Sequence, residues 1–191
     1  MTKDGSVARG GTRGKLVLGG IGTLLLGAAI VILSTMSSPL VVSLALGVGA
    51  VLAFVASVGW RALADRHGGV HSVAAAFWIV LGTGQLLSLL GLVADVAILF
   101  FVGQLGAALG LMFGAISSGV ALLAGGARRS LLPLRLIAGI VLMLGGAASL
   151  WSFLFLVSVK LPLMAPVTSI AVWGTAAGLV LAGVTLLATT D

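Results

Sequence analysis

The chain lacks cysteine, tyrosine, glutamate and asparagine, and each of these absences excludes a class of site. Without cysteine, the protein forms neither a disulfide nor a thiolate metal site, and it has no cysteine nucleophile. Without asparagine, it has no N-glycosylation sequon. Its only acidic side chains are the four aspartates Asp4, Asp65, Asp95 and Asp191. Carboxylate catalysis and metal chelation therefore have few residues to draw on.

Charged side chains are scarce as well. They make up 7% of the 191 residues, whereas a soluble domain carries about 25%. Hydrophobic residues account for 60% of the chain, so too little polar surface remains to cover a globule in water. We therefore expect lipid to be the solvent of the outer surface. Abundant Gly, Ala, Val and Leu with little Lys is typical of a GC-rich prokaryotic genome.

The net charge of +6 does not indicate a nucleic-acid partner. The ten Lys and Arg residues occur in short groups between long apolar runs, which is the pattern of membrane orientation signals. We expect them to face anionic lipid headgroups at the membrane surface, and we expect no nucleic acid.

Six apolar segments are long enough to cross a bilayer. The first, residues 16–36, would rise roughly 31 Å as a helix and match a hydrocarbon core of about 30 Å. We predict an all-α polytopic membrane protein, in which residues 1–15 form a flexible basic arm and residues 16–191 form one transmembrane domain. The predicted spans are residues 16–36, 40–60, 73–94, 96–122, 136–159 and 167–189.

The third and fourth spans come from one apolar stretch, residues 73–122, that contains a single charge, Asp95. One helix of that length would extend roughly 75 Å, so the chain must fold back. We expect the turn at Asp95, with its carboxylate capping the N-terminus of the following helix. The polar segment Arg61–His71 is expected to be a loop, and Gly125–Arg135 is expected to connect the fourth and fifth spans.

The basic residues also predict the orientation. With six spans, the N-terminal arm, both polar connections and the C-terminus share one side, which carries nine of the ten Lys and Arg residues. The positive-inside rule then places both termini in the cytoplasm, in the plasma membrane of a prokaryote. A cleaved signal peptide is the alternative interpretation of residues 1–38. However, the apolar run is longer than a usual h-region, and STMSSP is a poor cleavage site.

Pairs of glycines seven residues apart indicate a threefold repeat of helical hairpins. They occur at Gly20–Gly27 (GIGTLLLG), Gly84–Gly91 (GQLLSLLG) and Gly139–Gly146 (GIVLMLGG). Both glycines of a pair lie on one helix face, where they let another helix approach. The alternative is chance, because glycine accounts for 29 of the 191 residues.

Three glycine-bearing hairpins in a small six-span protein resemble the HdeD-like family of bacterial membrane proteins. The first hairpin, GGIGTLLLGAAIVILSTMSSPLVVSLALG with Pro39 in its turn, carries most of the likeness, which extends loosely over residues 16–190. The second hairpin lacks a proline turn, and the tryptophans do not repeat in register. The resemblance implies a stress-associated membrane role without a defined biochemical mechanism.

Two glutamines, Gln85 and Gln104, are the candidate functional residues inside the membrane, where polar groups are costly. They lie ten residues before and nine residues after Asp95, so an antiparallel hairpin would place them at similar depth. We expect a hydrogen bond between their amides that clamps the two helices together. The alternative is that both amides line a path for a solute.

Asp95 and Lys160 are the only charges expected on the outer side. We interpret Asp95 as a helix cap and Lys160 as a side chain that extends to the interface, with a salt bridge or gate between them as the alternative. His67 and His71 are expected in the loop, because Gly68 and Gly69 between them oppose a helix. We do not expect them to bind zinc, because a zinc site needs three or four ligands. We predict no metal, cofactor or catalytic residue.

Small residues at four-residue spacing form a glycine zipper in the fourth span, and a shorter version occurs in the sixth. We expect these stripes to pack helices within the bundle; a homo-oligomer or a partner membrane protein is the alternative occupant. The residues concerned are Gly106, Gly110, Gly114, Ser118, Gly174 and Gly178.

Three functional classes remain for a chain of this kind. The scarcity of ionisable groups in the spans favours a non-catalytic accessory, scaffold or stress-associated membrane component over an enzyme. A small transporter or channel for a neutral or apolar solute, lined by Gln85 and Gln104, is the alternative. An intramembrane enzyme would need an acid, base or metal inside the bundle, and the sequence shows none.

Overall fold

The computed structural model describes residues 4–34, 38–124, 131–156 and 164–189, and these form six helices and no strand. Each helix contains a segment long and apolar enough to cross a membrane. The predicted multi-pass, all-α architecture is thereby confirmed. The helices are α1 (Asp4–Ser34), α2 (Pro39–His67), α3 (Gly69–Val93), α4 (Ala97–Ala124), α5 (Leu132–Leu156) and α6 (Met164–Ala188).

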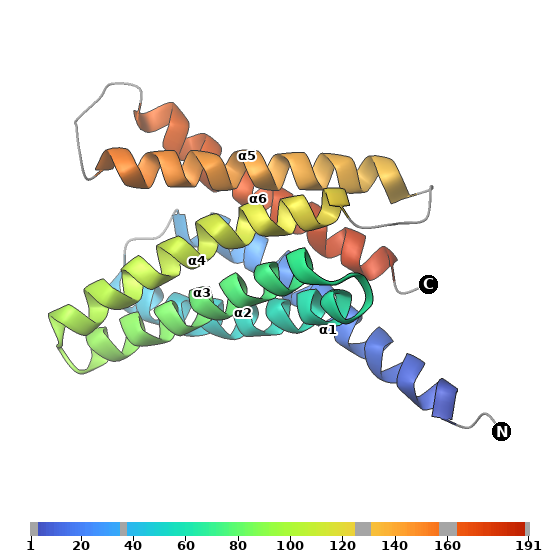
Figure 1. Ribbon diagram of the computed structural model, residues 1–191. Coiled ribbons are helices and arrows are strands. Elements are labelled where there is room, and N and C mark those ends of the chain that lie inside the picture. Colours follow the sequence, from blue (N-terminus) through green and yellow to red (C-terminus); the bar gives the residue numbers. More distant parts are fainter. Residues whose placement is uncertain (1–3, 35–37, 125–130, 157–163, 190–191) are drawn as a thin grey trace.

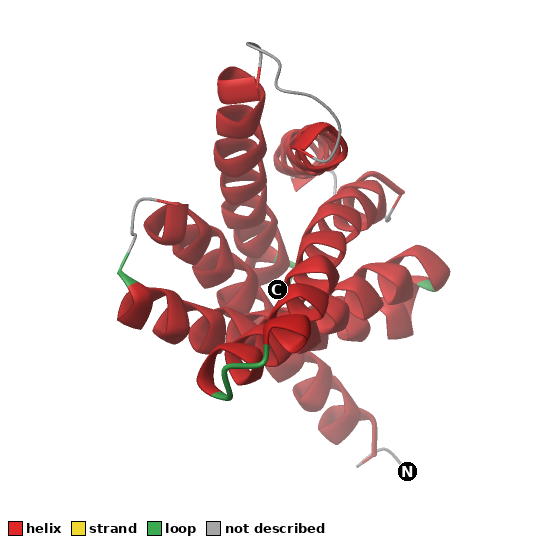
Figure 2. Ribbon diagram, turned by 90° about the vertical axis from the view of Figure 1, so that its left-hand side faces the viewer, coloured by secondary structure: helices red, strands yellow, loops and turns green. Residues whose placement is uncertain are grey.

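The six helices close into a ring. Each helix packs against its neighbours in the sequence, and α1 packs against α6 to complete the circle. The ends of the chain lie at the same end of the bundle, at the right of Figure 1, and the turn around Asp95 lies at the opposite end. We call these the terminal end and the Asp95 end. Figure 2 views the bundle from the Asp95 end.

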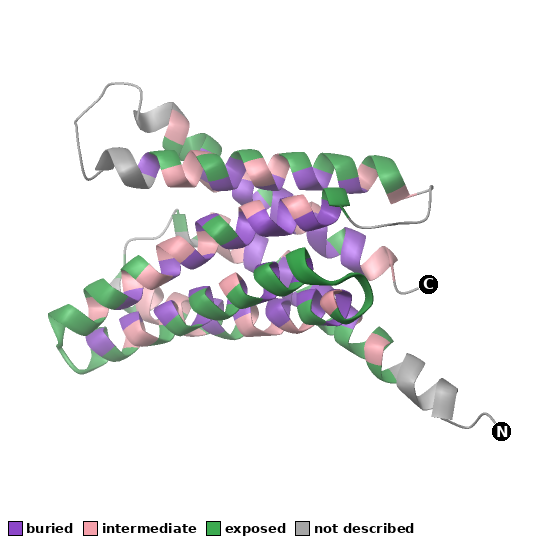
Figure 3. Cartoon of the chain, in the orientation of Figure 1, coloured by how far each residue is buried: buried purple, intermediate pink, exposed green. Residues whose placement is uncertain are grey.

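Burial differs between the places where the helices meet and the tip of the α3–α4 hairpin. The fully buried large side chains include Leu16, Trp60, Trp78 and Leu186. By contrast, residues 92–99, around the turn between α3 and α4, are all exposed. Figure 3 shows this difference as purple segments where the helices meet and a green tip on the α3–α4 hairpin.

Helix α1 begins at Asp4, so residues 4–15 of the predicted flexible arm are helical, and residues 1–3 lie outside the described residues. The apolar span supplies the helix nucleus, and each further residue then adds a backbone hydrogen bond without a new nucleation step. A polar, glycine-rich composition alone therefore did not end the helix.

The predicted loop Arg61–His71 is also wrong. Helix α2 continues to His67 and α3 begins at Gly69, so only Gly68 separates them. Gly68 has φ 82°, a left-handed conformation that glycine adopts without a Cβ clash, and its N–H bonds the carbonyl of Ala64 at 2.8 Å. One residue therefore reverses the chain, and the polar segment on either side remains helical.

The turn lies at Asp95 as predicted, but the role predicted for Asp95 is wrong. Its φ of 53° places it in the left-handed region, and Val96 N–H bonds Gly91 O at 2.8 Å. This is the six-to-one bond of a Schellman motif, so Asp95 terminates α3 rather than capping α4. The carbonyl of Val96 accepts the first bond of α4, from Phe100 N–H at 3.2 Å. Aspartate tolerates this conformation better than most residues do.

Candidate functional site

The glycine zipper of α4 faces α3 of the same chain. A methyl group added to Gly110 would lie 2.6 Å from Leu81 Cα, and one added to Gly114 would lie 3.4 Å from the Trp78 ring. The packing around Gly106 is looser, because a methyl group added to Gly106 would lie 3.6 Å from Gly84 Cα. The stripe therefore packs against α3 within the bundle, most tightly at Gly110.

The shorter stripe of α6 faces α5 in the same way. Gly174 lies against Gly145, and an added methyl group on Gly178 would meet the Leu142 side chain at 2.8 Å. Ser149 of α5 donates to Gly145 O at 2.9 Å and lies 3.5 Å from the Thr175 hydroxyl of α6. Both predicted stripes thus form helix seams inside one chain.

The predicted glycine pairs each face a single neighbouring helix, but not in a threefold arrangement. Gly20 and Gly27 contact α6, and Gly139 and Gly146 contact α4. In both cases the contacted helix is the second helix of the hairpin that is the neighbour around the ring. The pair at Gly84–Gly91 contacts α4 of its own hairpin instead. The second hairpin therefore departs from the repeat that the spacing of the glycines suggests.

The predicted hydrogen bond between Gln85 and Gln104 is absent from the described residues. The Gln85 amide points at α2, where an added methyl group on Gly49 would lie 2.7 Å from Gln85 Oε1. That oxygen is buried and has no hydrogen-bond partner. The reason is the helical period. Gly84 and Ser88 face α4, whereas Gln85, one residue after Gly84, lies about 100° around the helix and faces away from α4. Equal depth does not bring two side chains together when they lie on different faces.

A tryptophan–serine hydrogen bond joins α3 and α4 instead. Trp78 is fully buried, and its Nε1 donates to Ser118 Oγ at 2.9 Å. The sequence placed Ser118 on the zipper stripe but assigned it no partner. One signal in the sequence points to this contact. Trp78 lies three residues before Leu81 and six before Gly84, so it shares the helix face that these residues turn toward α4.

Polar and aromatic side chains gather inside the ring at the terminal end. Trp60 is fully buried, and its Nε1 has no hydrogen-bond partner among the described residues. His71, expected in a loop, is 5% exposed in the first turns of α3, 6.5 Å from the Trp60 ring and 5.5 Å from the His67 ring between centroids. Arg135 lies within electrostatic range of His71.

Arg135 was predicted in the connection before the fifth span, but it lies in the first turns of α5 and is 6% exposed. Its guanidinium donates to Leu122 O at 2.6 Å. Leu122 belongs to the last turn of α4, where carbonyls have no partner within the helix and a cation offsets the negative end of the helix dipole. Arg135 therefore caps α4 from a neighbouring helix, a role that sequence spacing does not reveal.

The predicted outer charges do not form a described pair. Asp95 is exposed at the turn, and Lys160 lies outside the residues that the structure describes. Within the described segments no group of three or more His, Asp or Glu side chains is placed to hold a metal ion.

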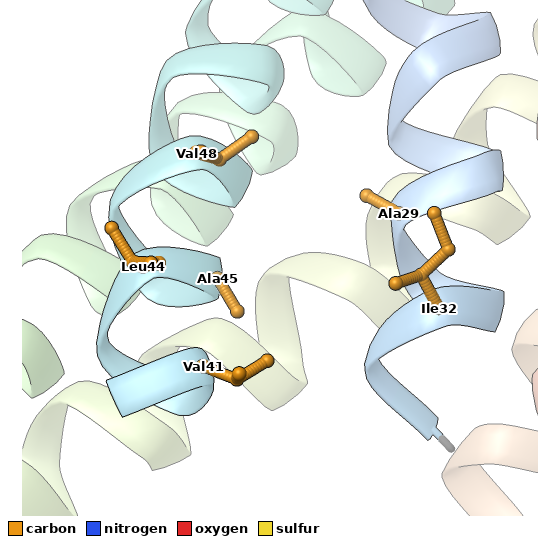
Figure 4. A pocket seen from close by; sticks show the side chains of 6 residues that line it. All are labelled: Ala29, Ile32, Val41, Leu44, Ala45 and Val48. Carbon is orange, nitrogen blue, oxygen red and sulfur yellow. The ribbon is translucent and has the colours of Figure 1, made fainter. Parts of the chain in front are cut away.

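One apolar wedge opens between α1 and α2 toward the Asp95 end. It has a volume of about 220 Å³ and is lined by aliphatic side chains only, among them Ile32, Leu44 and Val48 (Figure 4). Such a hollow offers no polar group to orient a ligand, so lipid chains fit it better than a polar solute does.

Comparison with known proteins adds no family to this picture. No family model matches the chain, and neither a curated protein nor a solved structure matches it.

Proposed function

We propose that this protein is a non-catalytic component of a prokaryotic cell membrane, acting as an accessory or scaffold subunit. The proposal rests on one observation: the large buried side chains of the described helices form one apolar cluster. Trp60, Leu26, Leu142 and Leu179 are at most 1% exposed. The leucines among them offer no polar group to a solute or a substrate.

The buried polar groups support the same conclusion, because most of them hold the helices themselves. Thr23 donates to Gly19 O at 2.7 Å and Ser88 to Gly84 O at 3.0 Å, each within its own helix. The bond from Trp78 to Ser118 joins two helices. Hydroxyl groups used in this way have their hydrogen bonds satisfied inside the bundle and are not free to act on a substrate.

The outer surface of the Asp95 half carries large aromatic side chains for contact with lipid or with a neighbouring membrane protein. Phe101 is 69% exposed, Trp151 54% and Trp173 58%. Exposed aromatic rings provide a large contact area at low entropic cost, as a scaffold subunit requires. A stress-associated role rests on the resemblance to the HdeD-like family alone.

The proposal is tested by native mass spectrometry of the protein extracted from its own membranes into nanodiscs. We expect a complex of defined stoichiometry with a second membrane protein, and we expect Phe101→Ala or Trp173→Ala to weaken it. Leu132→Ala, at an exposed site of the terminal end, serves as the control. A chain that carries no second protein and transports a solute in liposomes would overturn the proposal.

The orientation is part of this proposal, with both termini in the cytoplasm as the positive-inside rule favours. Because the chain has no cysteine, a single introduced thiol reports the side of the membrane on which it lies. A membrane-impermeant maleimide should label Val96→Cys in intact cells, and it should label Arg66→Cys only after the cells are opened. The reverse pattern would invert the topology.

A second function, transport of a neutral or apolar solute, is favoured by Gln85. A buried amide oxygen without a partner is costly, and it could serve a passing hydrogen-bond donor. In liposomes, Gln85→Leu should then abolish flux of a small neutral solute such as glycerol, whereas Gln104→Leu, whose side chain does not bond Gln85, should retain it. Flux unaffected by Gln85→Leu would end this alternative.

A further inference from the structure

A second hollow lies between α2 and α3 at the terminal end of the bundle. It has a volume of about 260 Å³ and is lined by Arg61 from α2 and by Ser72, Ala75, Ala76 and Ile79 from α3. Arg61, Ser72, Ala76 and Ile79 are exposed, so the hollow opens on the outside of the ring, where lipid lies. It is therefore a groove on the lipid-facing surface and not an internal cavity.

The two polar side chains at this groove are unengaged among the described residues. The Arg61 guanidinium forms no ion pair there, even though Asp65 lies one helical turn away, and the Ser72 hydroxyl has no hydrogen bond. Arginine presents a planar set of N–H donors that matches phosphate oxygens, and serine adds a neutral donor. The mouth of the groove thus offers the donors that a phosphate group accepts from.

The rest of the groove is apolar. Ala75 and Ala76 leave the surface low beside α2, and Ile79 continues the same side of α3 one turn deeper into the membrane. These apolar side chains form the floor of the groove. A free phosphate ion would occupy only the mouth and would make no favourable contact with this floor. A molecule that joins a phosphate to a hydrocarbon chain occupies both parts.

The position along the helices agrees with such an occupant. Arg61 follows directly after the apolar run that ends at Trp60, so it lies at the level of the headgroups, with the groove running toward the hydrocarbon. The exposed cations Arg13, Lys15 and Arg66 lie toward the same end of the bundle and attract anionic lipid to it.

We propose that the groove between α2 and α3 binds one anionic phospholipid, with its phosphate on Arg61 and Ser72 and an acyl chain along Ala76 and Ile79. This site is independent of the accessory function above. It is specific, because it requires both the donors at the mouth and the apolar floor below them.

The test is native mass spectrometry of the purified protein titrated with phosphatidylglycerol or, as the neutral counterpart, phosphatidylcholine. The wild type should retain one phosphatidylglycerol in preference to phosphatidylcholine. Arg61→Gln should weaken that retention about fivefold, equivalent to the roughly 1 kcal/mol that one basic residue near an anionic surface contributes. Ala76→Leu should weaken it as well by filling the floor, while both variants keep the wild-type melting temperature without lipid.

Arg66→Gln is the matched control, because Arg66 is exposed on the same helix but does not line the groove. It should leave the retention of one phosphatidylglycerol unchanged. Equal losses in Arg61→Gln and Arg66→Gln would show attraction by charge alone and overturn the proposal. Displacement of the lipid by millimolar inorganic phosphate, or full retention in Ala76→Leu, would show that the floor plays no part and would overturn it too.

Discussion

The α3–α4 and α1–α2 hairpins are both rich in glycine, yet one is closed along its length and the other opens into a wedge. Between α3 and α4, glycines face the partner helix at every level, from Gly91 near the turn to Gly114. Among the described glycines, those that bring α1 close to α2 lie toward the terminal end, where Gly19 meets Gly59 and Gly22 meets Ala56. Toward the Asp95 end the gap of about 220 Å³ remains.

The difference lies in where the glycines point and not in how many there are. Gly27, which lies near the wedge in the sequence, faces α6, and α2 presents Val41, Leu44 and Val48 to the gap. Branched and long side chains hold two helices apart, whereas a face without Cβ atoms lets backbones touch. A seam therefore needs glycine on the face that meets the neighbouring helix, on at least one of the two helices.

The largest expected effect comes from adding the same bulk to the seam and to the wedge. Gly110→Leu forces a side chain against the Leu81 backbone and should lower the free energy of unfolding by about 3 kcal/mol or prevent folding. Ala45→Leu extends into the wedge and should change it by less than about 1 kcal/mol, because the space is already there. Thermal unfolding in detergent measures both. Equal losses of unfolding free energy in the two variants would contradict the difference between the closed α3–α4 seam and the open α1–α2 wedge.

Gly19→Ala tests the tightest of the glycine contacts between α1 and α2. A methyl group on Gly19 would overlap the Gly59 backbone, so the helices must separate, and we expect a loss of about 1–3 kcal/mol. The control is Gly14→Ala on the same helix, where an added methyl group meets nothing within 4 Å. If both variants melt at the same temperature, the contact between Gly19 and Gly59 contributes nothing to stability.

The hydrogen bond from Trp78 to Ser118 should contribute a smaller amount to the α3–α4 seam. Trp78→Phe and Ser118→Ala each remove the bond, and a double-mutant cycle isolates it at about 0.6–2 kcal/mol. Strictly additive losses of unfolding free energy would mean that the two side chains do not interact. The stability of the α3–α4 seam near Trp78 would then come from packing alone.

Gly106→Ala should have the smallest effect, and in the opposite direction. The added methyl group lies 3.6 Å from Gly84 Cα, an ordinary contact, and alanine favours a helix over glycine by about 0.5–1 kcal/mol. We expect a slightly higher melting temperature than that of the wild type. A large drop would show that the seam is equally tight at Gly106 and Gly110.

Particular residues mark the limit of what the sequence could predict about the site. The zipper from Gly106 to Ser118 follows from four-residue spacing alone, but its partner helix does not. Gln85 and Gln104 fall at matched distances from the turn, yet Gln85 faces α2. Arg135 was predicted in a connection between spans, but it lies in α5 and caps α4 through a hydrogen bond to Leu122 O. In each case the local pattern specifies a position along a helix but not the helix opposite.

The sequence by itself determined that this chain is a bundle of six membrane-crossing helices that reverses at Asp95, because segment length and hydrophobicity are local and bilayer thickness is fixed. Only the tertiary structure decided that the helices close into a ring, that Trp60, His71 and Arg135 lie inside it, and that the α1–α2 seam opens while the α3–α4 seam does not. The physical reason is that lipid is as apolar as the helix surfaces, so hydrophobicity does not select which faces meet. Close packing and hydrogen bonds make that selection, and both depend on atoms from two helices at once.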